Sequence, residues 1–288
     1  MCKKKYFMVG MPESGKTTYL VSLCRQVSMG SAYTILRMRE EDIPTGLPNI
    51  ENLIGNLLEG KEVGRTLGKT QYDIKIPLID EADNEIELTI PDLSGEIFRD
   101  FIHDRRLLKE IADKLIQADE ILFFINTNTM IKQEYLSLTK KSAMKIIEEK
   151  NPELKEITPN EETFLEAVND KSNQSEIVDL LQGILFITKG KVKIKFVITA
   201  WDKVEKEDEE KEILPEIYIK RELPLLYQYV KTNTDKFGYQ IWGVSAQGGD
   251  FGNEQEKNQI LENGLDKYIK VVDFNGQISG DLTIILHG

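Results

Sequence analysis

The sequence predicts an α/β fold in which a six-stranded, mostly parallel sheet with one antiparallel edge strand is covered by helices on both faces. Two observations along the 288 residues predict this architecture. Short apolar runs alternate with longer segments of helical periodicity, which is typical of βα units. A turn-rich spacer at residues 80–84 separates two neighbouring runs, and it predicts a hairpin that would supply the antiparallel strand.

The expected strands are runs of mainly apolar, β-branched and aromatic residues. They cover residues 6–9, 73–79, 85–90, 121–125, 194–199 and 240–244. Apolar residues recur at helical spacing in three segments, residues 17–27, 107–116 and 177–185. Pro224 fits the first turn of one further helix, because proline there lacks only an N–H that would have no helical partner.

We interpret residues 1–288 as a single domain with a helical insertion at about residues 128–191. The stretch between the fourth and fifth expected strands is long for a connection. It carries helical patterns but lacks an apolar set large enough for a core of its own, so a second domain is not expected.

Composition excludes several classes of function. A net charge of −12 argues against nucleic-acid or anionic-membrane partners, which most of the surface would repel. Two cysteines and two histidines are too few for a cysteine-rich zinc site or a mechanism with several imidazoles. No segment approaches the roughly 20 apolar residues of a membrane span, so we expect a soluble, cytoplasmic protein without such a span.

Residues 10–17 read Gly-Met-Pro-Glu-Ser-Gly-Lys-Thr and fit the pattern G-x-x-x-x-G-K-[ST] between an expected strand and helix. Glycines let backbone N–H groups turn toward phosphate oxygens, and the following helix N-terminus adds positive potential. Lys16 would lie between the β- and γ-phosphates of a nucleotide, and the Thr17 hydroxyl would bind Mg²⁺. The expected nucleotide-binding residues here are Gly10, Glu13, Ser14, Gly15, Lys16, Thr17 and Thr18.

Three more polar segments follow strand ends. Residues 88–96 place Asp92 where Mg²⁺ needs a carboxylate, and Gly95 where an N–H can sense a γ-phosphate. The fifth strand ends in Thr-Ala-Trp-Asp at residues 199–202, and the sixth in Ser-Ala-Gln at residues 245–247.

With these four motifs in this order, the chain resembles a Ras-like P-loop GTPase of the TRAFAC class, and most of all the bacterial double-GTPase family. The resemblance covers the chain except the insertion. It implies binding of GTP and GDP, Mg²⁺ as cofactor, and unidentified partner proteins that read the switch loops, in a bacterial conflict or defence system.

The resemblance assigns base reading to Asp202, whose two oxygens match the N1–H and N2–H₂ donors of guanine. Thr199 and Ala200 stand where the usual base-reading motif has asparagine and lysine, so adenine remains an alternative. Trp201 would stack on the base or pack in the core. Backbone N–H groups of Ser245, Ala246 and Gln247 would face the guanine carbonyl.

For hydrolysis, the resemblance assigns catalysis to Lys16, to Glu96 in the place of a water-orienting glutamine, and to a switch threonine that also binds Mg²⁺. Glu96 either orients water or acts in the switch. The threonine is Thr66 or Thr70, with Thr66 favoured because its glycine-flanked loop suits movement. An arginine finger would come from Arg65, Arg99, Arg105 or Arg106 or from a partner; surface ion pairs are the alternative for each.

The sequence therefore favours a slow, Mg²⁺-dependent GTPase that acts as a switch, releasing the Thr66 loop and the segment after Asp92 on hydrolysis. Two alternatives stay open. One is a nucleotide-binding interaction module with little hydrolysis, and the other is a P-loop ATPase or small-molecule kinase.

Overall fold

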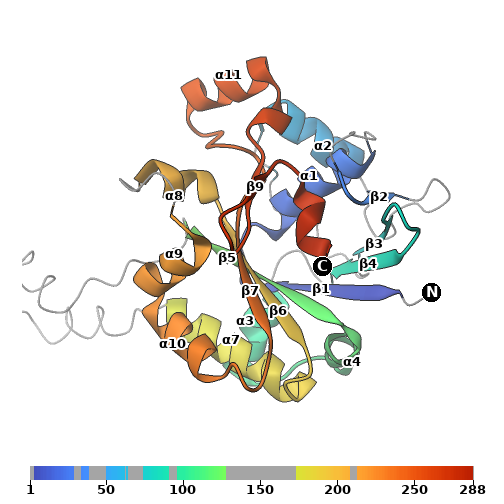
Figure 1. Ribbon diagram of the computed structural model, residues 1–288, viewed down its shortest axis with the longest axis vertical. Coiled ribbons are helices and arrows are strands. Elements are labelled where there is room, and N and C mark those ends of the chain that lie inside the picture. Colours follow the sequence, from blue (N-terminus) through green and yellow to red (C-terminus); the bar gives the residue numbers. More distant parts are fainter. Residues whose placement is uncertain are drawn as a thin grey trace, which may run out of the picture.

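The structure is a computed structural model that describes residues 3–28, 34–38, 50–61, 63, 74–90, 96–127, 173–207 and 213–287. Its centre is a nine-stranded sheet in the order β2-β3-β4-β1-β5-β6-β7-β8-β9 (Figure 1). The strands are β1 Lys4–Gly10, β2 Arg37–Met38, β3 Ile74–Ile79, β4 Glu85–Ile90, β5 Glu120–Asn126, β6 Lys193–Thr199, β7 Tyr239–Ser245, β8 Lys270–Val272 and β9 Ile278–Ser279. The middle five strands are parallel, so their carboxyl ends share one edge.

The predicted α/β class and hairpin are confirmed, but the predicted strand count is wrong. β3 pairs antiparallel with β4 through the expected turn, in which Asp80 accepts the N–H groups of Ala82 and Asn84. The described residues form nine strands instead of six, and antiparallel strands lie at both edges of the sheet instead of one. The three additional strands, β2, β8 and β9, are two or three residues long, too short to show strand periodicity in sequence.

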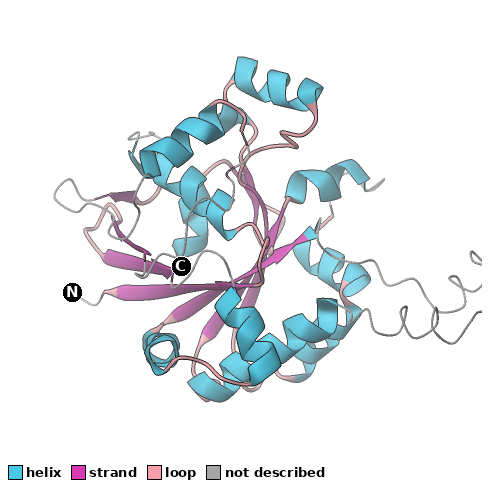
Figure 2. Ribbon diagram, turned by 180° about the vertical axis from the view of Figure 1, so that it is seen from behind, coloured by secondary structure: helices cyan, strands magenta, loops and turns pink. Residues whose placement is uncertain are grey.

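Helices cover both faces of the sheet (Figure 2). They are α1 Lys16–Ser28, α2 Ile50–Leu58, α3 Glu96–Asp104, α4 Lys109–Gln117, α7 Asn173–Thr188, α8 Trp201–Glu207, α9 Pro215–Glu222, α10 Pro224–Thr232 and α11 Glu254–Asn263, with short 3₁₀ turns η2 Leu265–Lys267 and η3 Leu282–Leu286. None of these described helices is long and apolar enough to cross a membrane.

Strand alternation divides the apolar core into two clusters, one on each face. On β1, Tyr6 and Met8 join the cluster of α1, α2 and η3, whereas Phe7 and Val9 join the cluster of α3, α4, α7, α9 and α10. α7 lies within the range predicted as an insertion and packs in the second cluster. Residues 128–172 of that range lie outside the described residues, so the single-domain organisation stays a prediction.

The C-terminal turn η3 is held on the sheet by buried polar contacts. The Tyr6 hydroxyl donates to Leu286 O at 2.6 Å, and Lys195 Nζ donates to Ile285 O at 2.7 Å. Lys195 also forms a buried ion pair with Glu120 at 2.8 Å. Burial alone would raise the pKa of Glu120, but the ammonium groups of Lys195 and Lys4 hold it below its ordinary value. The chain end is thereby attached to β1 and β6.

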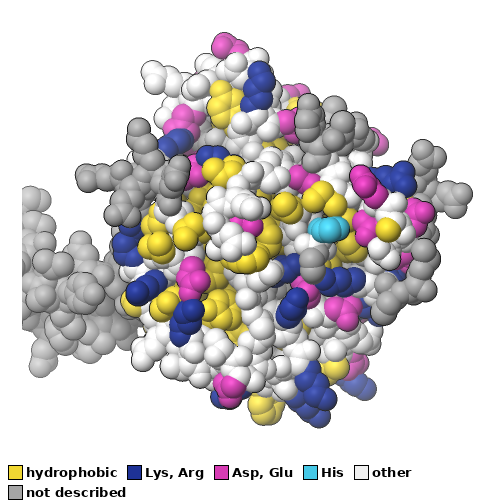
Figure 3. All heavy atoms as spheres, viewed as in Figure 1, with side chains coloured by type: hydrophobic (Ala, Val, Ile, Leu, Met, Phe, Trp, Pro, Cys, Tyr) yellow, Lys and Arg dark blue, Asp and Glu magenta, His cyan; other side chains and the backbone are white. Residues whose placement is uncertain are grey.

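At the opposite edge from β2, a hairpin of β8 and β9 closes the sheet. Apolar side chains gather in the middle of the face shown in Figure 3. In the hairpin, the side chains of Phe274 and Ile278 are 42% and 64% exposed. The ring of Phe274 meets Trp242 of β7 edge-on, with 6.0 Å between the ring centroids. This contact supports the short edge strands that the sequence did not predict.

We predict that Gly243→Ala lowers the free energy of unfolding by about 1–3 kcal/mol, the usual cost of overpacking a core. A Cβ atom at this position in β7 would lie 2.7 Å from Cε2 of the buried Trp201 indole. Gly55→Ala in α2 is the matched control, because its Cβ meets nothing within 4 Å. That change should stabilise the protein by about 0.5–1 kcal/mol. Urea unfolding measures both, and equal effects would contradict the packing argument.

Candidate nucleotide-binding site

The loop between β1 and α1 has a conformation that requires glycine. Gly15 has φ = 86°, and a Cβ there would lie 2.7 Å from the Thr199 hydroxyl oxygen. A Cβ on Gly10 would lie 2.9 Å from the Phe124 carbonyl oxygen. Glu13 also has a positive φ, 64°, although it is not glycine. The glycines predicted at both ends of the phosphate loop are therefore needed for its shape.

Lys16 is fixed inside this loop. Its side chain is buried, with 2% of the residue exposed. Nζ donates to the carbonyl oxygens of Gly10 and Met11, both at 2.8 Å, and contacts Ser14 Oγ at 3.0 Å. These neutral oxygens hold the ammonium in the hollow of the loop, at the N-terminus of α1. The loop and the helix end together place positive potential at one point, as an anion site requires.

Two side chains connect the phosphate loop to the neighbouring strands. At the end of β6, the Thr199 hydroxyl donates a hydrogen bond to Ser14 O at 3.0 Å. At the end of β5, Asn126 Nδ2 donates to Glu13 O at 2.7 Å. Thr199 thus connects β6 to the loop, at the position where the usual base-reading motif has asparagine. The carboxyl ends of β1, β5 and β6 form one connected site.

The expected base-reading residues meet beside this site. Ser245 Oγ, at the end of β7, donates to Asp202 Oδ1 at 2.7 Å, which orients the carboxylate. Lys203 forms an ion pair with Asp250 at 3.0 Å, so α8 is attached to the loop after β7. The Lys203 ammonium, with the N–H of Gly252, holds the pKa of Asp250 below its ordinary value. Ala246 and Gln247 follow Ser245 in the same loop.

Trp201 is a core residue in this structure. Its side chain is completely buried, and its ring meets Tyr218 of α9 edge-on at a centroid distance of 5.5 Å. The indole also lies against Gly243 of β7. Of the two roles considered for the Trp201 side chain, packing in the core fits its position.

Asp92, Gly95, Thr66 and Thr70 lie outside the described residues, and so does the side chain of Glu96, whose backbone begins α3. Thr17 and Thr18 lie half-buried in the first turn of α1.

Of the arginines considered as fingers, Arg105 forms an ion pair with Asp179 of α7 at 2.9 Å. Arg99 and Arg106 are exposed, and Arg65 lies outside the described residues. For Arg105, the position fits the surface ion pair.

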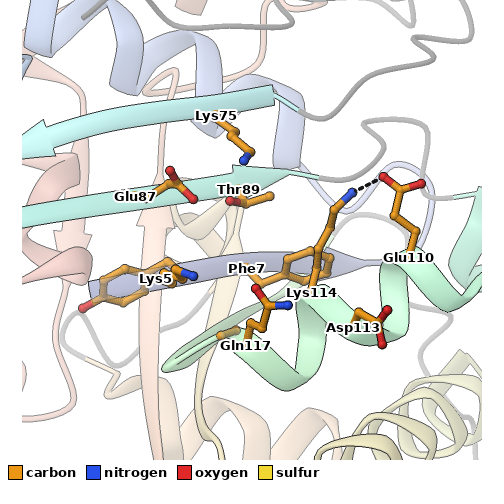
Figure 4. A pocket seen from close by; sticks show the side chains of 11 residues that line it. Lys5, Phe7, Lys75, Glu87, Thr89, Glu110, Asp113, Lys114 and Gln117 are labelled. Carbon is orange, nitrogen blue, oxygen red and sulfur yellow. Dashed lines mark hydrogen bonds and ion pairs between the residues drawn. The ribbon is translucent and has the colours of Figure 1, made fainter. Parts of the chain in front are cut away.

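A separate cleft of about 280 Å³ opens between β1, β3, β4 and α4 (Figure 4). Lysines and acids both line it, including Lys5, Lys75, Glu87 and Asp113. It lies beside the first half of β1, whereas the phosphate loop follows the last residue of that strand. The cleft is therefore distinct from the nucleotide site. The nucleotide site is identified by the loops at the carboxyl ends of the strands, not by the volume of a cavity.

Sequence reasoning missed Asn126 and Thr127. The available signal was two polar residues directly after the apolar run of β5, at the edge where the other motifs end. Asn126 contacts the phosphate loop, and the Thr127 hydroxyl donates to Ala200 O at 3.3 Å. Strand-end position alone does not show which carbonyl such a side chain reaches.

A phosphate loop between β1 and α1, at the carboxyl edge of a parallel sheet, defines a P-loop nucleotide-binding protein. The family model described as Double-GTPase 1 matches residues 7–287. The chain therefore belongs to the Double-GTPase 1 family, and the predicted resemblance to Ras-like P-loop GTPases is confirmed. None of the curated proteins compared with the chain matches it.

The chain is also similar to solved structures at 10–15% sequence identity. The bacterial selenocysteine-specific elongation factor EF-Sec is 15% identical with a TM-score of 0.40, and the match covers 91% of this chain but only 29% of the factor. The signal recognition particle receptor SRb-GTP/SRX complex from Chaetomium thermophilum is 10% identical, with a TM-score of 0.42 and coverage of 91% and 99%. The Arl6 small GTPase from Trypanosoma brucei is 12% identical, with a TM-score of 0.32 and coverage of 93% and 99%.

Proposed function

We propose that the protein binds GTP and GDP at the carboxyl edge of its sheet, hydrolyses GTP slowly with Mg²⁺, and so switches a surface read by a partner protein. One observation carries this proposal. Thr199 links the phosphate loop to the strand that leads directly into Asp202, and Asp202 is oriented by Ser245. A phosphate site and a carboxylate suited to guanine therefore lie on one connected framework.

Each half of the framework has a defined chemical task. The loop of residues 10–17 offers backbone N–H groups and the Lys16 ammonium to the phosphates. The Asp202 carboxylate accepts two hydrogen bonds, which guanine supplies from N1–H and N2–H₂ and adenine does not. Ser245 holds one carboxylate oxygen in place, so that this pair of acceptors keeps a fixed direction.

The chemistry of the expected ligands favours Mg²⁺. No cluster of three acidic, histidine or cysteine residues that could hold a metal is found in the described part of the chain. Mg²⁺ at nucleotide phosphates needs only one or two protein oxygens in addition to phosphate and water. Thr17, Asp92 and Thr66 carry oxygen atoms of this kind and would hold the ion, which would neutralise charge on the phosphates.

We infer that hydrolysis changes the segments around Thr66 and after Asp92, because both would bind the γ-phosphate end of GTP. Glu96 follows Gly95 and would orient the attacking water or respond to its loss. A partner that recognises these segments would then distinguish GTP from GDP. The family resemblance favours a partner in a bacterial conflict or defence system.

A second candidate function is nucleotide binding with little hydrolysis. Glu96 favours it, because a carboxylate next to the γ-phosphate adds negative charge where phosphoryl transfer needs charge neutralisation. The two candidates share the binding site and differ only in the rate of the chemical step.

Single-turnover hydrolysis in Mg²⁺ tests the proposal, with GTP and ATP compared at protein excess. We expect GTP cleavage on the order of 10⁻⁴ to 10⁻² s⁻¹, the range of Ras-like enzymes without a partner. ATP should remain unbound. Tight GTP binding without cleavage would support the second candidate, and equal cleavage of ATP would overturn guanine selection.

A further inference from the structure

Two turns of the site have the same unusual backbone conformation. Glu13 in the phosphate loop has φ = 64°, and Ala200 in the turn before Asp202 has φ = 55°. This left-handed region is adopted easily by glycine and disfavoured for residues with a Cβ atom. Neither position is glycine, so the surrounding structure must hold each turn in place.

Both turns are held by neighbouring residues at the end of β5. Asn126 Nδ2 donates to the carbonyl oxygen of Glu13 at 2.7 Å, and Thr127 Oγ1 donates to the carbonyl oxygen of Ala200 at 3.3 Å. Each acceptor is thus the carbonyl of a residue with positive φ. The dipeptide Asn126-Thr127 therefore contacts both positive-φ residues, Glu13 in the phosphate loop and Ala200 in the turn before Asp202.

We propose that Asn126 and Thr127 form a clamp, a pair of positioning residues that holds the phosphate loop and the base-reading turn in their binding conformations. The inference rests on the proposed function, since it concerns the same nucleotide site. It adds that β5 sets the nucleotide affinity, although neither residue belongs to the family motifs in this sequence.

The direction of the two bonds explains the effect. The bond from Asn126 holds the carbonyl end of the Glu13–Ser14 peptide group, whose N–H donates to Met11 O at 3.2 Å, and so fixes the turn of the loop that surrounds Lys16. The bond from Thr127 helps to hold the turn before α8, which contains Asp202; the Lys203 N–H donates to the same Ala200 oxygen at 3.0 Å. Without the clamp, each turn relaxes toward more favourable backbone angles. Nucleotide binding must then restore the binding conformation, and the free energy that this costs lowers the affinity.

The test measures the release of fluorescently labelled GDP from the chain of residues 1–288. Asn126→Ala and Thr127→Val should each release GDP about 3- to 10-fold faster, the effect of one lost neutral hydrogen bond. Glycine at the strained position removes the need for the clamp. Glu13→Gly should therefore restore slow release to Asn126→Ala, and Ala200→Gly should restore it to Thr127→Val.

The crossed combinations provide the specific readout. Ala200→Gly should not rescue Asn126→Ala, and Glu13→Gly should not rescue Thr127→Val, because each clamp residue holds one turn. Asn263→Ala and Thr232→Val are matched controls, since both side chains donate to helix carbonyl oxygens, at 2.8 and 2.9 Å. Their GDP release should equal that of the wild type, and urea unfolding reports any general loss of stability.

The outcomes separate this inference from the proposed function. Wild-type release by Asn126→Ala and Thr127→Val, or faster release that glycine does not rescue, overturns the clamp and leaves the GTPase proposal intact. If the wild type retains ADP instead of GDP, the guanine proposal fails, and the same variants measured with labelled ADP decide the clamp. A wild type that binds neither nucleotide overturns both.

Discussion

Lys16→Ala is expected to weaken binding of GDP and GTP by about 100- to 1,000-fold, as happens when one partner of a buried, charged contact is removed. The buried ammonium is held by three oxygen atoms of its own loop. Its position is thus set before the nucleotide arrives, and phosphate oxygens would gain a fixed positive charge. Alanine removes this charge and leaves the loop oxygens facing one another.

Calorimetric titration of nucleotide-free protein measures the loss. Lys114→Ala is the control. Lys114 lies in α4, which leads into the amino end of β5 and not into the carboxyl edge where the nucleotide site lies, and it is paired with Glu110. Thermal unfolding of both variants shows whether the fold survives. Unchanged GDP affinity in a folded Lys16→Ala protein would contradict the assignment of residues 10–17 to phosphate binding.

Asp202→Asn is expected to weaken GDP binding by about 100-fold, the effect of losing a charged hydrogen-bond acceptor. Asparagine presents one acceptor and one donor, so its NH₂ group faces the guanine N2–H₂ donor. Xanthine has a carbonyl at that position and accepts from the NH₂ group. The variant should therefore bind xanthosine diphosphate better than the wild type does, a change of preference that general loss of structure does not produce.

Ser245→Ala is the matched comparison for Asp202. It removes the hydroxyl that orients the carboxylate but keeps the two acceptors, so its effect should be smaller and should leave guanine preferred. Titrations with GDP, ADP and xanthosine diphosphate measure the three preferences. Binding of ADP that is as tight as GDP in the wild type would show that residues 199–202 serve packing alone.

Local sequence determined much of this protein. The phosphate loop was predictable because its glycines, Lys16 and Thr17 occur at fixed spacing between a strand and a helix, and the structure shows that a Cβ at Gly10 or Gly15 would collide. The five parallel strands and the β3–β4 hairpin were predictable because each apolar run is long enough to show its pattern. The family followed from the order of four such local motifs.

Only the tertiary structure decided the remaining features. Trp201 could stack or pack, and Gly243 on a strand distant in sequence provides the space in which it packs. β2, β8 and β9 exist because neighbouring strands supply their hydrogen bonds. Asn126 and Thr127 have no motif of their own, since their acceptors lie 113 and 73 residues away in the chain. Spacing along the chain encodes local conformation, whereas these roles depend on contacts that form only when distant segments meet.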